Sequence, residues 1–226
     1  MDNAVVFHVF GFGITRTVVT TWGLMVLLAV LSWIGTRRLA MTPGRWQTVL
    51  EGAVESIDNA IRAVLPQPPP GLVALVGTFW IFIVFANLTG IIPGLSSPTE
   101  DLSLTSALAL IVFASVHWFG IRANGLRGFL RQYLEPNPVM LPFHIISELS
   151  RTLSLAVRLF GNIMSLEMAA LLVLIVGGLL VPVPVLMLHI VEALVQAYIF
   201  GMLALVYISG GIQSHQAVAQ RRAATQ

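Results

Sequence analysis

Five long apolar segments constrain this chain more than any other feature of its sequence. They cover residues 19–36, 72–93, 103–121, 143–181 and 183–214 of the 226. About 20 apolar residues in a helix cross a bilayer core roughly 30 Å thick. A backbone in hydrocarbon must satisfy its own polar groups, which a helix achieves within one segment. The sequence therefore predicts an all-α membrane protein, one domain over residues 1–226, with about five transmembrane helices.

The composition excludes several other classes of protein. Hydrophobic residues make up 57% of the chain and charged residues only 10%, against about 25% charged in an average soluble domain. Cysteine is absent, which excludes disulfides and thiolate metal sites. The net charge is only +2, and the arginines sit at span ends rather than in a patch, which argues against nucleic-acid binding. No segment resembles a phosphate-binding Gly-Lys-Ser/Thr loop, so the sequence predicts no nucleotide site. We therefore expect no nucleic acid, metal or cofactor to be bound.

Residues 43–65 show a different pattern. Val49, Ala53, Ile57 and Ile61 recur at helical spacing, with charged residues between them. This pattern predicts an amphipathic helix on the membrane surface. A helix packed on the extramembrane domain of a partner is the alternative.

The arginines predict the orientation. They cluster in the first loop, in the connection 122–142 and at the C-terminus, whereas Glu100 and Asp101 occupy the second loop without a basic neighbour. By the positive-inside rule, the first and third loops and the C-terminus are cytoplasmic. The N-terminal segment 1–18 is then outside.

The last two apolar segments are too long to stand upright in a membrane. A helix over 143–181 would measure about 58 Å, nearly twice the hydrocarbon thickness. It and the helix over 183–214 are joined around Pro182 and Pro184. We expect a long, tilted hairpin.

Polar residues follow helical steps of three or four along both of these helices. On the first they are Glu148, Arg151, Ser154, Arg158, Asn162 and Ser165, and on the second they are His189, Glu192 and Gln196. Facing residues of antiparallel helices have a nearly constant number sum. One register therefore sets Arg158 level with Gln196 and Glu167 level with His189, with Glu192 near Asn162. This predicts an ionisable seam inside the bilayer.

Each residue of this seam also has a simpler interpretation. Arg151 could snorkel to the interface, Gln196 could make an interhelical hydrogen bond, and Glu167 with His189 could be a structural bridge. We assign His8, His117, His144 and His215 to interfacial or incidental positions. Taken together, a hydrated seam of titratable groups conducts protons, and the permanent cation of Arg158 blocks free passage.

Four segments carry a resemblance to a known family. They are Asn87-Leu88-Thr89-Gly90…Pro93-Gly94, Pro98-Thr99-Glu100-Asp101-Leu102, Glu148…Arg158-Leu159-Phe160-Gly161-Asn162, and Gln196-Ala197-Tyr198…Tyr207-Ile208. The chain resembles subunit a of the F-type ATP synthase. The resemblance implies a non-catalytic bacterial inner-membrane subunit that wraps a rotating ring of c subunits and contacts peripheral-stalk b subunits and lipid. ATP chemistry would reside in partner subunits.

The resemblance also implies roles for the seam. Arg158 would face the ion-carrying carboxylate of the ring and separate two half-channels, with Gln196 beside it. Glu167, His189 and Asn162 would line the outer half-channel, and Ser154 and Glu148 the cytoplasmic one. Glu192 matches no core position of the family; it could partner Arg158 or Asn162, extend the outer half-channel, or tune the choice of ion. The ion would be a proton or sodium.

Two rival functions remain at this point. A secondary transporter could use Arg158 to bind an anionic substrate, although we find no internal repeat of the kind many transporters carry. A structural scaffold is the other rival, although a scaffold gains nothing from buried charges.

Overall fold

The computed structural model describes residues 5–9, 12–37, 44–92, 97–134, 141–177 and 182–223. Within them, a short antiparallel hairpin of β1 (Val5–Val9) and β2 (Phe12–Thr15) precedes the helices. The α-helices are α1 (Arg16–Thr36), α2 (Arg45–Val64), α3 (Leu72–Leu88), α4 (Leu102–Leu134), α5 (Leu141–Gly177) and α6 (Pro182–Ala223). Two short 3₁₀ turns, η1 (Thr89–Ile91) and η2 (Pro98–Glu100), lie between α3 and α4.

The all-α architecture is confirmed. In the described part of the chain, α1, α3, α4, α5 and α6 are the 5 helices long and apolar enough to cross a membrane. The β1–β2 hairpin was not predicted, because residues 1–18 carry no apolar segment long enough to define an element by periodicity. The link at residues 178–181, where the sequence predicts the end of the hairpin, lies outside the described residues.

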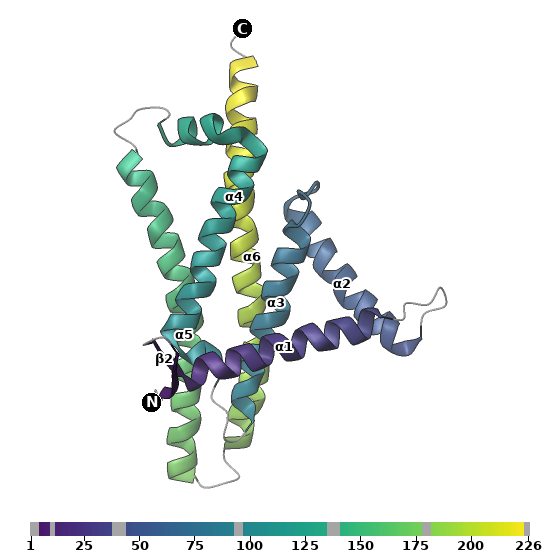
Figure 1. The fold of residues 1–226 in the computed structure, drawn as a ribbon, viewed down its shortest axis with the longest axis vertical. Coiled ribbons are helices and arrows are strands. Elements are labelled where there is room, and N and C mark those ends of the chain that lie inside the picture. The colour runs from purple at the N-terminus through teal and green to yellow at the C-terminus, as the bar shows by residue number, and fades with distance from the viewer. Residues whose placement is uncertain are drawn as a thin grey trace.

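The long helices and α1 run in different directions. Figure 1 shows α1 crossing α3 and α6 at a steep angle, whereas α4, α5 and α6 run side by side. With its 21 residues, α1 is about 32 Å long and matches the hydrocarbon thickness. At 37 residues, α5 is about 56 Å long. If α1 stands upright in a bilayer, α5 and α6 are therefore strongly tilted.

The two halves of α2 have different surroundings. Ile57, Ile61 and Val64 pack with α3 and α6, and Ile61 is fully buried. The apolar side chains of the first half, such as Val49 and Trp46, are exposed. The apolar face predicted at 43–65 exists, and its placement on a membrane surface remains a prediction.

Small residues allow the helices to approach one another closely. Ala86, Ala109, Ala156, Ala197 and Ala204 are all buried in one core that joins α3, α4, α5 and α6. Lipid is as apolar as a side chain, so packing in membranes depends on such close contacts rather than on the hydrophobic effect. At Gly201 on α6, a Cβ would overlap the indole ring of Trp80 on α3.

The helix α4 contains a sharp kink. Gly125 has φ 71° and ψ 159°, a conformation that glycine adopts without steric cost. After it the helix continues to Leu134 in a new direction, and Figure 1 shows this end lying across the top of the bundle. Phe129 from this end is buried against α4 itself, next to Gly120.

Candidate functional site

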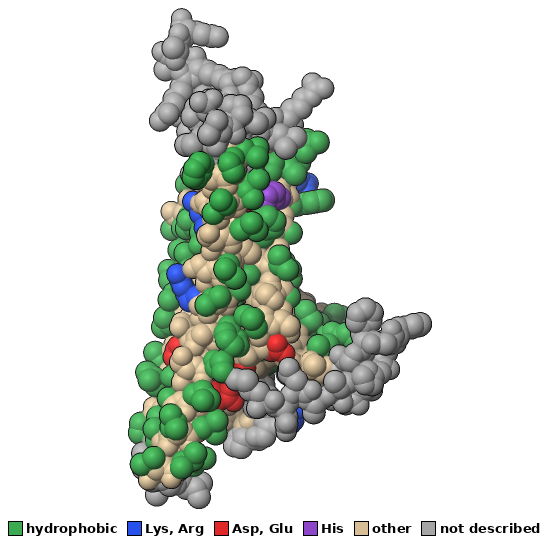
Figure 2. Space-filling view, turned by 90° about the vertical axis from the view of Figure 1, so that its left-hand side faces the viewer, with side chains coloured by type: hydrophobic (Ala, Val, Ile, Leu, Met, Phe, Trp, Pro, Cys, Tyr) green, Lys and Arg blue, Asp and Glu red, His purple; other side chains and the backbone are tan. Residues whose placement is uncertain are grey.

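The predicted cation lies on the outer surface of the helix bundle. Arg158 is exposed on α5, beside the exposed side chains of Leu153 and Val157. Within the described residues, no hydrogen bond or ion pair engages its guanidinium. Figure 2, which faces the α5 side, shows basic side chains as isolated patches on a largely apolar surface. Ser154, one turn before Arg158, is exposed as well. We call this side the Arg158 face.

The C-terminal half of α5 contacts a buried polar network at η2. The Ser97 hydroxyl donates to the Ala86 carbonyl (2.8 Å), and the Thr99 hydroxyl donates to Asn87 Oδ1 (2.7 Å). These bonds fix η2 against the end of α3. The backbone N–H of Ser97 also donates to Glu100 Oε1 at 2.9 Å, and this capping bond holds Glu100 in place.

Glu100 meets Glu167 of α5 at this point. Two ionised carboxylates this close would repel each other. Partial burial of Glu100, followed by its hydrogen bond with Glu167, raises the pKa of Glu100 to about 8. We call Glu100, Glu167, Asn87, His189 and Glu192 the Glu100 cluster.

His189 is buried on α6 and reaches the end of α3. Its Nε2 lies 3.2 Å from the Asn87 carbonyl oxygen. A carbonyl only accepts, so Nε2 carries the hydrogen and Nδ1 is the nitrogen that gains or loses a proton. Glu192, one turn along α6 and half-buried, interacts electrostatically with His189. Glu167 and His189 thus reach the same region from α5 and α6. Glu167 lies beside Glu100, and His189 lies beside Asn87.

The contact between α5 and α6 has a different register from the one we predicted. Asn162 Nδ2 donates to Gln196 Oε1 at 2.7 Å, and Gln196 is almost fully buried. The partner of Gln196 is therefore Asn162, one turn beyond Arg158. The physical reason is that Arg158 points away from α6, on the exposed face, while Asn162 lies on the half-buried side. The prediction that Arg158 lies level with Gln196 was therefore wrong by one helical turn.

A second polar region surrounds Glu148, near the N-terminal end of α5. A cavity of about 190 Å³ lies between α4, α5 and α6, and we call it the Glu148 cavity. Its lining includes His144, Ser147, Glu148, Arg151, Tyr207 and Phe129. The Arg151 guanidinium lies 5.7 Å from the centroid of the Tyr207 ring, a cation–π distance.

The predicted residues thus separate into three groups along α5. Glu148 precedes Arg158 by about 15 Å, and Glu167 follows it by about 14 Å, at 1.5 Å per residue. Polar groups therefore lie on both sides of the exposed arginine, at similar distances. Among the described residues, no three or more His, Asp or Glu side chains are grouped so that they could hold a metal ion.

Sequence reasoning missed several of these residues. Glu100 was used only to assign the outer loop, Asn87 only as part of a motif, and His117 was set aside as incidental. His117 Nδ1 lies 3.7 Å from Glu148 Oε1. The signal that could have marked Asn87 and His117 is a polar side chain within an apolar span, which is costly unless it has a partner.

Comparison with known proteins decides the family. The family model of the ATP synthase A chain matches residues 18–209. The chain belongs to the ATP synthase subunit a family. It is 60% identical to ATP synthase subunit a 2 of Pelobacter propionicus, over 93% of this chain and 92% of that protein. It is 53% identical to ATP synthase subunit a of Legionella pneumophila, over 95% and 94% of the two chains.

Membership in the ATP synthase subunit a family, with the 5 apolar helices, makes this chain a multi-pass membrane protein of a bacterial membrane. It is a non-catalytic membrane subunit of the ATP synthase and has partners in the membrane sector of that complex.

Proposed function

We propose that this subunit carries a proton or a sodium ion through two half-channels at its interface with the rotating c-ring. The ion gradient is thereby coupled to ATP synthesis or hydrolysis in partner subunits. In this proposal the Arg158 face contacts the ring, the peripheral-stalk b subunits bind elsewhere on the chain, and lipid covers the remaining apolar surface.

The single observation that carries the proposal is the exposed Arg158. A cation facing lipid at the centre of a helix costs at least about 2.5–3.5 kcal/mol. Arginine keeps its proton, so it cannot avoid this cost by becoming neutral. An acidic group on a partner offsets the cost. The carboxylate of a ring subunit, passing Arg158 as the ring turns, is such a group, and pairing with Arg158 favours release of its ion.

The two polar regions on either side of Arg158 supply the half-channels. The Glu100 cluster, which contains Glu167, His189 and Glu192, receives ions from outside, and Asn162 lines the same half-channel. The Glu148 cavity, with Ser154 toward the ring, opens to the cytoplasm. Gln196 holds Asn162 and so flanks the arginine. A direct path between the regions would pass the permanent charge of Arg158, which repels a cation.

The orientation follows from the same proposal. The N-terminal hairpin and η2 lie outside, and the kinked end of α4 and the C-terminal end of α6 lie on the cytoplasmic side. The strong tilt of α5 and α6 relative to α1 fits two helices that follow the convex surface of a ring.

The rival function, a secondary transporter that binds an anion at Arg158, needs an enclosed binding site around that residue. Arg158 instead lies on an open, apolar surface of the described chain. This exposure favours a protein partner over a small-molecule substrate.

Photo-cross-linking tests the ring interface directly. The chain has no cysteine, so Val157→Cys or Leu153→Cys creates one attachment point for a benzophenone maleimide on the Arg158 face. Irradiation of the purified complex should link this subunit to a c subunit. Val26→Cys on α1, 63% exposed in this structure, is the matched control and should not give that product. Equal cross-linking from α1, or none from α5, contradicts the proposal.

A further inference from the structure

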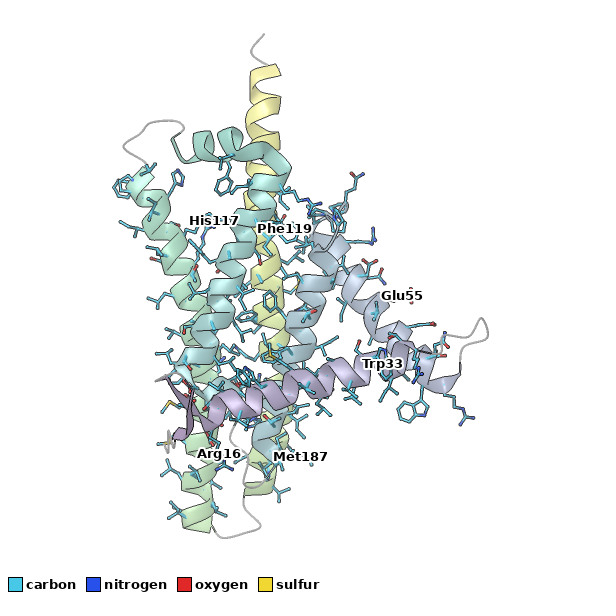
Figure 3. The ribbon with its side chains drawn as sticks, viewed as in Figure 1. Arg16, Trp33, Glu55, His117, Phe119 and Met187 are labelled. Atoms are coloured by element: carbon cyan, nitrogen blue, oxygen red, sulfur yellow. The ribbon has the colours of Figure 1, made fainter. Side chains whose placement is uncertain are left out.

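Glu148 lines the Glu148 cavity and also pairs with His117, a residue to which the family resemblance gave no role. The two members of the pair come from different helices: His117 from α4 and Glu148 from α5. Nδ1 of His117 lies 3.7 Å from Glu148 Oε1, and the two side chains are 30% and 18% exposed. Figure 3 shows the labelled His117 on the side of α4 that faces α5. The pair is thus largely shielded but not sealed from water.

The tautomer of His117 follows from its backbone contact. Nδ1 lies 2.9 Å from the carbonyl oxygen of Phe113. Since that oxygen only accepts, Nδ1 carries a hydrogen, and Nε2 is the nitrogen that binds or releases a further proton. When Nε2 is protonated, the ring is a cation beside the Glu148 carboxylate, so the pair holds an added proton without a net buried positive charge.

Aromatic rings close one side of His117. Phe113 lies 4.4 Å and Phe129 lies 5.4 Å from the imidazole, centroid to centroid. Phe129 reaches this position only because the backbone turns at Gly125 and the helix folds back. The polar approach to the pair is therefore through Glu148, which lines the cavity.

The cavity is large and polar enough to hold water. Its volume of about 190 Å³ exceeds by several-fold the roughly 10–15 Å³ that one water requires. The other charged or titratable groups that line the cavity with Glu148 are His144 and Arg151 on α5 and Tyr207 on α6. The fixed charge of Arg151 disfavours a metal cation here, whereas a proton crosses by exchange between water and side chains.

We propose that His117 and Glu148 form the proton-transfer station of the cytoplasmic half-channel. The inference rests on the proposed function. A proton released from the ring carboxyl passes through cavity water and is bound at the pair, on the Glu148 carboxylate or on His117 Nε2. The same pair then gives a proton to cytoplasmic water and returns to its initial state. No redox partner is needed, and during ATP hydrolysis the steps run in reverse.

The test uses inverted membrane vesicles that contain the whole complex. ATP-driven acidification is measured between pH 6 and 8.5 for wild type, His117→Gln and Glu148→Gln. Each substitution should reduce pumping about a hundredfold, the lower end of what a positioned acid–base group contributes. The pH profile of the residual pumping should also differ from that of the wild type.

Trp118→Phe is the matched control, because Trp118 is the next residue on α4 and is 66% exposed. It should retain the wild-type rate and profile. Arg158→Ala, assayed in parallel, separates two failures. If Arg158→Ala abolishes pumping while His117→Gln keeps the wild-type rate and pH profile, the proton station is wrong and the proposed function stands. If Arg158→Ala pumps normally, the proposed function is wrong.

Two further outcomes also decide the inference. If His117→Gln does not assemble, Glu148→Gln carries the test, with the same expected loss of rate and profile. Pumping that requires sodium and is unchanged in Glu148→Gln overturns the inference, because a proton station would then have no part in transport.

Discussion

Replacing Glu100 by glutamine should remove a specific pH dependence of stability. Glutamine has the shape of a protonated glutamate, and its carbonyl oxygen can still accept from the Ser97 backbone N–H. In the native protein, burial and the bond to Glu167 raise the pKa of Glu100 from 4.5 to about 8. The variant should resemble the wild type in acid and become the more stable protein in alkali.

The sign follows from proton linkage. Below pH 4.5 the carboxyl is protonated in both folded and unfolded chains, given the ordinary pKa of 4.5. As the pH rises toward the folded pKa of about 8, only the unfolded chain gives up this proton, so stability falls, and the loss is complete above that value. The full difference corresponds to about 5 kcal/mol, at about 1.36 kcal/mol per pH unit. Because Glu100 is only half-buried, solvent screening reduces this to about 1–2 kcal/mol.

Unfolding in mixed micelles, followed by circular dichroism at pH 5 and pH 9, measures this effect. The wild type should lose about 1–2 kcal/mol more than Glu100→Gln between the two pH values. Asp101→Asn is the control, because Asp101 Oδ1 accepts from the Ser103 backbone N–H at the start of α4. It should leave stability nearly unchanged at both pH values, because asparagine caps a helix about as well as aspartate. Parallel pH curves for wild type and Glu100→Gln would refute the reasoning.

Two other predictions concern packing and the α5–α6 contact. Gly201→Ala should destabilise the fold by about 1–3 kcal/mol, as overpacking does, because its Cβ would overlap Trp80. The same unfolding assay measures this loss. Gly23→Ala is the control and should be nearly neutral, because no atom lies within 4 Å of its Cβ. Asn162→Ala and Gln196→Ala should show a coupling energy of about 0.6–1.7 kcal/mol in a double-mutant cycle, and zero coupling would contradict their hydrogen bond.

The architecture could be predicted because hydrocarbon allows a spanning segment few alternatives. The apolar segments 72–93 and 103–121 become α3 and the first part of α4, since only a helix satisfies their backbone. This reasoning could not predict the kink at Gly125. Glycine is compatible with a helix, a turn or a kink, and the packing of Phe129 against Gly120 selects among them. The β1–β2 hairpin was missed for a similar reason, because two short strands leave little periodic signal.

The order of the polar residues along each helix was predictable, but their partners on other helices were not. Helical steps placed the polar residues of α5 in one stripe, whereas the structure has Arg158 on the exposed face and Asn162 on the half-buried side. The register with α6 was wrong by one turn, because a number sum ignores the direction in which each side chain points. Glu100 and His117 lie on elements far from α5 in sequence, so no spacing rule links them to Glu167 and Glu148. Their pairing depends on how η2 and α4 pack, which is a property of the whole bundle.

ATP-driven pumping by Arg158→Ala tests the central claim most directly. The variant complex is purified with its ring to show that it assembles, and acidification is then measured in inverted vesicles with ATP. Because Arg158 is exposed and lacks a hydrogen-bond partner in the described chain, its removal should leave the fold intact. The account predicts an assembled complex that pumps no ions. An assembled complex that pumps at the wild-type rate would contradict it.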